Sequence, residues 1–353
     1  MEIINDTSFI EVYGTDDDDT INNSGSFATV YAFNGNDSIF NDHAYYASVQ
    51  GGEGDDTIDN YGEYSTIDAG DGNDLIRNSA SNSTIIAGSG RDTIISDDNL
   101  RFVNISSGAG MDFIFNHSKN STITADDGVD FIFNYYGDNS IIDGGADNDV
   151  ILNYGEYSTV AGGAGNDTID NYASNVSING GEGNDILHSI VNLVLVTISG
   201  GKGNDTIYND SNYSYIFGGF GADSIISTSV SSYMYLSGDN DADTITNYSA
   251  NSTLEGGRGN DWIYNYAEGV TILFKNHDDE DTIYTYADDT IIVLPDVSLD
   301  DITSTDTGKD YYEIHFNKTN SLFVQDTGHT SKFMFSDGGT YVYNTANKAF
   351  IRS

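Results

Sequence analysis

The stretch GGEGDDTIDN at residues 51–60 recurs along the chain as AGDGNDLIRN at 69–78, GGAGNDTIDN at 162–171 and GGKGNDTIYN at 200–209. Its sixth position is an Asp that recurs in steps of 18 to 20 residues from one end of the array to the other. The series consists of Asp19, Asp37, Asp56, Asp74, Asp92, Asp112, Asp130, Asp149, Asp167, Asp185, Asp205, Asp223, Asp243, Asp261 and Asp281. A repeat of this length decides the architecture, because each copy is one supersecondary unit that needs its neighbours.

Two apolar columns accompany the Asp series. Two positions after each Asp, Ile occurs in 14 of the 15 copies, and Leu187 is the exception. A second column runs in antiphase, from Val12, Val30 and Val49 to Phe274. Two short β-branched strands per repeat, each followed by turn residues, predict one coil of a β-solenoid, and stacked coils share a continuous core. We therefore expect an all-β fold, a parallel β-roll of about 15 coils of 18–20 residues each.

A polar column follows the first apolar one. Four positions after the Asp, Asn occurs in 11 of the 15 copies, for example Asn60 and Asn134. Stacked Asn side chains form hydrogen-bonded ladders in cross-β structures. We expect such a ladder at one bend of the roll.

The loops that precede the Asp residues are rich in glycine. Nine of the 15 copies fit small-Gly-x-Gly-x-Asp, from GGEGDD at Gly51 to GGRGND at Gly256. Glycines allow sharp turns with positive φ and direct carbonyl oxygens to one place, while the Asp adds a carboxylate. Such oxygen ligands suit Ca²⁺ better than Mg²⁺. Stacked carboxylates also repel one another unless a cation lies between them.

These loops resemble the nonapeptide repeat of the RTX (repeats-in-toxin) family, Gly-Gly-x-Gly-x-Asp-x-U-x with U a large apolar residue. The resemblance covers about residues 14 to 285. It implies Ca²⁺ ions held between adjacent loops on one edge, a secreted bacterial protein, and export by type I secretion without a cleaved N-terminal signal.

The residues that we expect to bind calcium are the Asp and Gly of the loops. The expected carboxylate ligands are Asp56, Asp74, Asp92, Asp112, Asp130, Asp149, Asp167, Asp185, Asp205, Asp223, Asp243 and Asp261. The expected glycines are Gly52, Gly54, Gly70, Gly72, Gly88, Gly90, Gly108, Gly110, Gly163, Gly165, Gly181, Gly183, Gly201, Gly203, Gly219, Gly221, Gly257 and Gly259.

The other half of each coil departs from the family pattern. It reads NYGEYSTID from Asn60 or NYSANSTLE from Asn247, without the glycines and mostly with Ser or Asn in place of the Asp. We therefore expect a single row of ions on one edge. Six loops on that edge are degraded, and we expect those at the ends to act as caps or to bind weakly. They start at Gly14, Ala32, Ala125, Gly144, Gly238 and Asn276.

Composition excludes several classes of function. There are 56 acidic and 12 basic side chains, a formal charge of −44, so nucleic acid and anionic membranes are poor partners. Cysteine is absent, which excludes disulfides and thiolate sites. No apolar run approaches the length of a membrane span, so we expect none. The six histidines are scattered and no catalytic motif is present, so we expect no enzyme.

Outward positions suggest two interaction surfaces. The apolar patch consists of Phe113, Phe115, Phe131, Phe133, Val150 and Leu152, for which self-association and simple cross-strand stacking remain open. The tyrosine column consists of Tyr61, Tyr135, Tyr154, Tyr172, Tyr248 and Tyr266, for which packing over the bend is favoured over glycan binding. A partial Thr column beside Asp68, Ile86 and Glu255 is not a flat array, which disfavours ice binding.

We expect two regions. Residues 1–285 form the roll, with an N-terminal strand cap at about 1–13, and residues 286–353 form a β-rich C-terminal cap that includes a hairpin at 312–324 and a possible secretion signal. The expected function is that of an extracellular calcium-binding repeat protein that folds on binding Ca²⁺, in a structural, adhesive or interaction role. The alternatives are a glycan-binding module and a repeat region detached from a larger RTX toxin or enzyme.

Overall fold

The computed structural model describes residues 1–190, 192–228, 231–275, 279–307, 311–316, 320–326, 331–344 and 349–353. Within these residues the fold is all-β, and the one helical segment is a 3₁₀ turn, η1 (Leu299–Asp301). The expected fold class is confirmed. The chain divides into two compact units, Met1–Ser177 and Ile178–Ser353.

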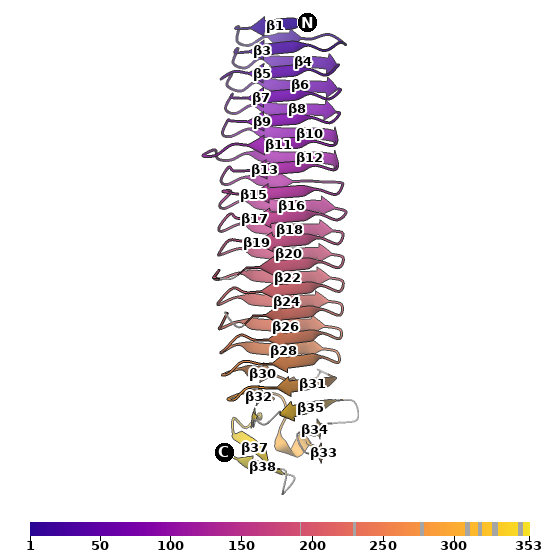
Figure 1. The fold of residues 1–353 in the computed structure, drawn as a ribbon, viewed down its shortest axis with the longest axis vertical. Helices are drawn as coiled ribbons and strands as arrows, with labels where there is room; N and C mark the ends of the chain where they lie inside the picture. The colour runs from indigo at the N-terminus through magenta and orange to yellow at the C-terminus, as the bar shows by residue number, and fades with distance from the viewer. Residues whose placement is uncertain are drawn as a thin grey trace. The chain divides into compact units, whose positions relative to one another are not determined.

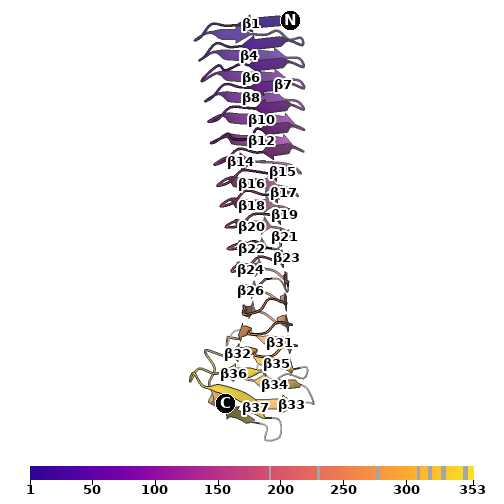
Figure 2. The ribbon, with the colours of Figure 1, turned by 60° about the vertical axis from the view of Figure 1, so that its left-hand side comes forward.

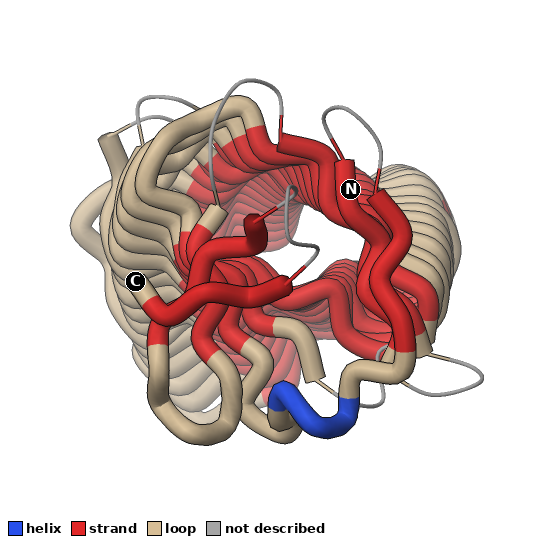
Figure 3. The backbone as a smooth tube through the Cα atoms, turned by 90° about the horizontal axis from the view of Figure 1, so that it is seen from below, coloured by secondary structure: helices blue, strands red, loops and turns tan. Residues whose placement is uncertain are grey.

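One coil shows how each unit is built. Strand β7 (Thr57–Asn60) is followed by a turn at 61–65, then by β8 (Thr66–Asp71) and a glycine-rich loop that ends at Asp74. In each unit, strands like β7 form sheet A and strands like β8 form sheet B. We name the turns that follow sheet A strands the asparagine edge and the loops that end at each Asp the glycine edge. Figure 3 looks along the coils and shows the loops gathered at edges between walls of strands.

The first unit contains ten strands of sheet A and nine of sheet B, stacked coil upon coil (Figure 1). Sheet A comprises β1 (Glu2–Asn5), β3 (Thr20–Asn23), β5 (Ser38–Asn41), β7, β9 (Leu75–Asn78), β11 (Thr93–Ser96), β13 (Phe113–Asn116), β15 (Phe131–Asn134), β17 (Val150–Asn153) and β19 (Thr168–Asn171). Sheet B comprises β2 (Glu11–Tyr13), β4 (Thr29–Asn34), β6 (Ser48–Glu53), β8, β10 (Thr84–Gly90), β12 (Asn104–Gly110), β14 (Thr122–Thr124), β16 (Ile141–Ala146) and β18 (Thr159–Ala164).

The second unit repeats the pattern and ends in antiparallel strands, which Figure 2 shows from a second direction. Sheet A comprises β21 (Ile186–Ser189), β23 (Thr206–Asn209), β25 (Ser224–Ser227), β27 (Thr244–Asn247), β29 (Trp262–Asn265), β31 (Glu280–Thr285), β33 (Ser304–Thr307), β34 (Tyr311–His315) and β35 (Ser321–Asp326). Sheet B comprises β20 (Ser177–Glu182), which begins at the unit boundary, β22 (Thr197–Lys202), β24 (Tyr215–Phe220), β26 (Tyr235–Asn240), β28 (Thr253–Arg258), β30 (Thr271–Leu273), β32 (Ile291–Val293), β36 (Lys332–Met334), β37 (Thr340–Asn344) and β38 (Ala349–Arg352).

Parallel pairing in register places identical positions of the repeat above one another. Ile58 pairs with Ile76 in sheet A, and Ile67 pairs with Ile85 in sheet B. All four side chains are fully buried. Because side chains alternate between the two faces of a strand, the two Ile columns face inward and form the core between the sheets, as the sequence predicts.

The last coils differ from the expected pattern in one register. Leu254 pairs with Ile272, so Ile272 and not Phe274 continues the second apolar column. Phe274 is still buried, but it packs against Phe316, with ring centroids 5.3 Å apart. The prediction for Phe274 was wrong because β30 ends at Leu273, before that residue.

The C-terminal segment continues the parallel pairing before it turns antiparallel. Strand β32 pairs with β30, β35 with β31 and β36 with β32, all in parallel. Strand β34 pairs antiparallel with β35, which confirms the expected hairpin; its turn includes residues 317–319, outside the described ranges. The domain boundary near residue 285 stays a prediction. Within the part of the chain that the structure describes, no helix has the length and apolar character needed to cross a membrane.

Candidate metal-binding edge

Glycines at the second and fourth positions of each loop occupy a conformation that other residues rarely adopt. Gly52 has a φ of +122° and Gly54 a φ of +125°. A Cβ on Gly70 would lie 2.1 Å from the carbonyl oxygen of Gly52, and one on Gly72 would lie 2.0 Å from that of Gly54. The glycines are therefore required both for the turn and for close approach of the neighbouring coil, whose carbonyl oxygens lie directly beside them.

The Asp that ends each loop points into the molecule and takes part in a ladder. Its Oδ1 accepts the backbone N–H of the Asp one coil earlier: Asp37 N–H donates to Asp56 at 2.8 Å, and Asp56 N–H donates to Asp74 at 2.7 Å. The same bond recurs in the second unit, where Asp205 N–H donates to Asp223 at 2.7 Å. The ladder holds every carboxylate in one orientation, coil after coil.

The second carboxylate oxygen, Oδ2, has a different environment. Among the described residues, no donor reaches the buried Oδ2 of ten of these residues, each at most 3% exposed. They are Asp37, Asp56, Asp74, Asp92, Asp130, Asp149, Asp205, Asp223, Asp243 and Asp261. A buried carboxylate oxygen without a donor is costly unless a cation compensates it. The repeat therefore generates a row of positions that need positive charge.

The raised pKa values of the buried Asp carboxyls also indicate that these positions need positive charge. Burial, the largest cause, together with neighbouring carboxylates raises the pKa of Asp56 to about 7 and that of Asp149 to about 8. In the second unit, burial raises the pKa of Asp243 to about 9, and Asp261 and Asp223 add to the effect. At Asp112 burial also raises the pKa, but the nearby hydroxyl of Ser107 opposes it.

Oxygens of two coils meet at the first position of the loop. The place of a Cβ on Gly51 lies 2.2 Å from Asp56 Oδ2 and 2.3 Å from the carbonyl oxygen of Ala69 in the next coil. In the second unit, the corresponding place on Gly200 lies 2.3 Å from Asp205 Oδ2 and 2.5 Å from the carbonyl oxygen of Gly218. A carboxylate oxygen of one coil and a carbonyl oxygen of the next thus lie close to the same glycine.

The ligands available on this edge fit a hard cation. No three His, Cys, Asp or Glu side chains come together at one point anywhere in the described residues. A metal on the glycine edge must therefore take most of its ligands from backbone carbonyls, with about one carboxylate per coil. That mixture of oxygen ligands is typical of Ca²⁺ rather than of Zn²⁺ or other metals that prefer nitrogen and sulfur.

The expected ligands all lie on the glycine edge. In each unit the structure aligns the Asp residues through the ladder and places the predicted glycines in the positive-φ region, from Gly52 to Gly165 and from Gly181 to Gly259. Of the degraded loop that starts at Asn276, residues 276–278 lie outside the described ranges.

Three of the other degraded loops, which start at Ala125, Gly144 and Gly238, keep the backbone of the intact ones. Asp126, Asp147, Asp239 and Asp241 replace motif glycines and have φ values of 72–76°, in the left-handed region that Asp tolerates. The ladder continues through them, since Asp112 N–H donates to Asp130 Oδ1 at 2.7 Å. These loops therefore retain the inward carboxylate and add another acidic side chain.

Sequence reasoning missed a second ladder on the outside of the glycine edge. Asn73 N–H donates to Asp55 Oδ1 at 2.8 Å, and Asp55 N–H donates to Asn36 Oδ1 at 3.0 Å. In the second unit, Asn204 N–H donates to Asn184 Oδ1 at 2.7 Å. The signal was present in the repeat, because the residue before the Asp is Asn or Asp in nine of the 15 copies.

The asparagine edge carries the expected ladder, whose buried amide side chains are uncharged. Asn41 Nδ2 donates to Asn60 Oδ1, and Asn60 Nδ2 donates to Asn78 Oδ1, both at 2.7 Å. In the second unit, Asn247 donates to Asn265 at 2.9 Å. All these side chains are buried, and their amides also bond the turn backbone, as between Gly62 N–H and Asn60 Oδ1 at 3.1 Å. The prediction of an Asn ladder is confirmed.

The outward aromatic side chains stack on one another. Rings of Phe113 and Phe131 lie 5.1 Å apart at 6°, and those of Phe115 and Phe133 lie 5.0 Å apart at 6°. The six members of the apolar patch are half-buried. In the tyrosine column, Tyr154 and Tyr172 stack at 4.4 Å. Since ring faces cover each other there, few remain open to a sugar.

The motif of the glycine edge also matches a known family of repeats. The family model "RTX calcium-binding nonapeptide repeat (4 copies)" matches residues 48–62, 68–99, 161–189, 196–212 and 246–264. No curated protein matches the chain significantly.

Two solved structures are distantly similar. One is a hyperactive, Ca²⁺-dependent, β-helical antifreeze protein from an Antarctic bacterium, 20% identical, matching 81% of this chain and 85% of that chain with a TM-score of 0.49. The other is a tailspike protein mutant of E. coli bacteriophage HK620, 10% identical, matching 93% and 68% with a TM-score of 0.19. Both TM-scores are below 0.5.

Proposed function

We propose that this chain, which carries RTX calcium-binding nonapeptide repeats, binds Ca²⁺ ions in a single row along the glycine edge and that this binding drives its folding. The proposed ligands are the Asp carboxylates and the backbone carbonyls of the loops. The asparagine edge lacks the Gly-x-Gly pair of the motif and the inward carboxylates, which favours one row over two.

The observation that carries the proposal is the row of buried Oδ2 atoms to which no described donor reaches. Hydrogen bonds already satisfy Oδ1, and these orient the carboxylate before any ion binds. Calcium would supply the missing positive charge to Oδ2. Because a cation between two coils contacts both, each ion would also join neighbouring repeats.

Coupling between binding and folding follows from the charge of the chain. With a net charge of −44, the metal-free chain repels itself, and an unfolded chain cannot assemble loops from successive coils. Each site stabilises the folded state by mass action, about 2.7 kcal/mol when the free ion is 100 times its Kd. Millimolar calcium outside the cell would favour folding there, which is consistent with a secreted protein.

The proposed role of the folded roll is structural, as an extracellular module that displays its outward faces. Face-to-face stacking in the tyrosine column argues against glycan binding at that position, because the ring faces are covered.

The test replaces Asp56, Asp74 and Asp92 together by Asn. Asn retains an Oδ1 that can accept the N–H of the preceding coil but removes three negative charges. The control replaces Asp68, Asp98 and Asp143, which lie outside the loops and at least partly in solvent, with the same change of charge. Isothermal titration of metal-free protein with CaCl₂ measures the number of ions bound, and circular dichroism follows β-structure.

We expect the loop variant to bind fewer ions than the wild type and the control to bind the same number. Equal calcium stoichiometry in the loop variant and the wild type would falsify the assignment of the glycine edge as the binding site.

A further inference from the structure

The outer face of sheet B in the second unit carries two adjoining hollows. One has a volume of about 470 Å³ and is lined by Tyr213, Tyr215, Tyr233 and Tyr235 with Asn251. The other has a volume of about 310 Å³ and is lined by Asp239, Glu255, Arg258 and Lys275. These volumes lie at the small end of the range of ligand sites. Strands β26 and β28 contribute to both hollows, so they form one surface.

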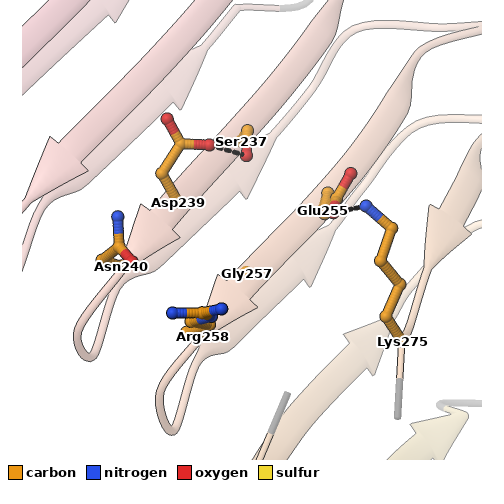
Figure 4. A pocket seen from close by; sticks show the side chains of 7 residues that line it. All are labelled: Ser237, Asp239, Asn240, Glu255, Gly257, Arg258 and Lys275. Atoms are coloured by element: carbon orange, nitrogen blue, oxygen red, sulfur yellow. Dashed lines mark hydrogen bonds and ion pairs between the residues drawn. The ribbon is translucent and has the colours of Figure 1, made fainter. Parts of the chain in front are cut away.

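Charged side chains of the second hollow come from three successive coils (Figure 4). Glu255, although it lies on the outer face, is only 7% exposed. Its carboxylate accepts a hydrogen bond from Tyr235 Oη at 2.5 Å and pairs with Lys275 Nζ. Asp239 accepts a hydrogen bond from the Ser237 hydroxyl. The hydrogen-bonding groups are thus held in place before a ligand arrives.

In the first hollow Tyr213 and Tyr233 stack like the tyrosine column, with centroids 5.3 Å apart at 1°, but the other two tyrosine rings are arranged differently. Tyr215 and Tyr235 are tilted by 41° with centroids 6.4 Å apart, and Phe217 is tilted by 50° from Tyr235. Tyr215 is 56% exposed. Tilted rings do not cover one another, so part of their apolar faces stays open to a ligand.

Residues of this surface also depart from the repeat. The position held by Tyr215 and Tyr235 is Thr in several other coils, such as Thr66 and Thr84, and these positions align in the paired strands. Glu255 stands where the coils on either side have Ser237 and Leu273. None of these changes serves the core or the glycine edge, because all of them lie on the outer face.

We propose that this surface, the sheet B hollow, binds an uncharged oligosaccharide. Open aromatic faces suit the apolar face of a sugar ring, and carboxylate, amide and guanidinium groups suit its hydroxyls. The two acidic and two basic side chains of the second hollow balance one another. The net charge of −44 on the chain repels anionic polysaccharides, which favours neutral ones. The second hollow borders the glycine edge, because Asp239, Gly257 and Arg258 belong to its loops, whereas Tyr215 and Glu255 lie outside those loops.

The experiment is affinity electrophoresis of the full, calcium-loaded chain in native gels that contain hydroxyethyl cellulose, xyloglucan, soluble starch or dextran, with chondroitin sulfate as an anionic gel. The variants are Tyr215→Ala and Glu255→Gln, the second of which keeps the shape of the side chain. The matched control is Tyr157→Ala, at a tyrosine 60% exposed in the first unit. Circular dichroism in calcium verifies that every variant is folded.

We expect at least one neutral polysaccharide to retard the wild type and the control equally. In both hollow variants, the dissociation constant obtained from the retardation should rise about tenfold. If no neutral polysaccharide retards the folded wild type, the proposal is wrong. It is equally wrong if only chondroitin sulfate retards the protein, or if both folded hollow variants migrate like the wild type. Because calcium binding is measured separately, failure here leaves the glycine-edge proposal intact.

Discussion

The glycine edge and the asparagine edge both stack identical polar side chains from successive coils, but they use different residues, Asp and Asn. On the asparagine edge an amide within an uninterrupted run of Asn, such as that of Asn60, donates to one neighbour and accepts from another, so the buried ladder needs no charge to balance it. On the glycine edge each carboxylate only accepts; Oδ1 receives a backbone N–H, while no described donor reaches Oδ2 in ten of the copies. Asn and Asp differ only in that Asn has an Nδ2 donor where Asp has an Oδ2 acceptor. This difference allows the Asn ladder to pair its own hydrogen-bonding groups, whereas the Asp ladder requires a cation.

Removal of calcium should lower the stability of the fold more than any other change considered below. The size of this loss should depend on pH. Burial raises the pKa of Asp56 to about 7 and of Asp243 to about 9, above the ordinary 3.8. The metal-free folded state therefore holds protons that the unfolded chain releases above pH 4. Metal-free stability is fully present below about pH 4 and is lost as pH rises from there through the raised pKa values of about 7 and about 9. Calcium must displace those protons, so its stabilising effect grows over the same range.

Thermal unfolding of metal-free and calcium-loaded protein at pH 5, 6, 7 and 8 measures this. We expect the difference in Tm to widen by more than 10 °C from pH 5 to pH 8. A metal-free Tm that rises with pH would contradict the assigned cause, since the row of carboxylates would then be ionised without cost.

The second prediction concerns the close approach of coils on the glycine edge. In Gly110→Ala the new Cβ would lie 1.5 Å from the carbonyl oxygen of Gly90, at a φ of +147°. We expect a loss of about 3 kcal/mol or more in free energy of unfolding, together with weaker calcium binding.

Gly338→Ala is the matched control. Its φ is +71°, but nothing lies within 4 Å of the new Cβ, so the backbone strain alone should cost about 1 kcal/mol. Chemical denaturation in calcium compares the two variants, and equal losses would show that coil contact plays no part.

Asn60→Ala should lower the free energy of unfolding less than Gly110→Ala does, and the loss should not depend on calcium. It removes the acceptor of Asn41 Nδ2 and of Gly62 N–H and the donor to Asn78 Oδ1, all of them buried. We expect a loss of about 1–3 kcal/mol that is the same with and without calcium. The control Asn73→Ala removes two exposed side-chain hydrogen bonds on the glycine edge, from Asn73 Nδ2 to Asp55 and from Arg91 N–H to Asn73 Oδ1, and should cost about 1 kcal/mol or less. A loss in Asn60→Ala that vanished in calcium would mean that the two edges are not energetically separate.

Sequence periodicity predicted the columns that the structure contains, because a strict repeat in parallel register converts sequence spacing directly into spatial stacking. Asp56 over Asp74 and Asn60 over Asn78 follow from spacing alone. Periodicity could not predict where strands end, so the last member of the apolar column was assigned to Phe274 instead of Ile272. Nor does spacing give side-chain direction on the outer face, where Tyr235 reaches Glu255 across coils.

The smallest expected effect concerns the apolar patch on β13, β15 and β17. Replacing Phe113, Phe115, Phe131 and Phe133 by Thr removes two stacked pairs, each worth about 0.5–1.5 kcal/mol. The rings are already half-buried by their neighbours, so little apolar surface remains for a second copy of the chain. We expect a lower Tm in calcium and an unchanged sedimentation coefficient across a range of protein concentrations.

Sedimentation velocity separates stacking from docking at this patch. If the wild type associates as its concentration rises and the variant does not, the patch is an interface between copies. On both edges, side chains form hydrogen bonds to the neighbouring coils of the same chain. The apolar patch would follow this pattern if its rings contacted only one another. If the apolar patch only stabilises its own stack, the sheet B hollow, with its tilted rings and charged side chains, remains the proposed surface for binding a ligand.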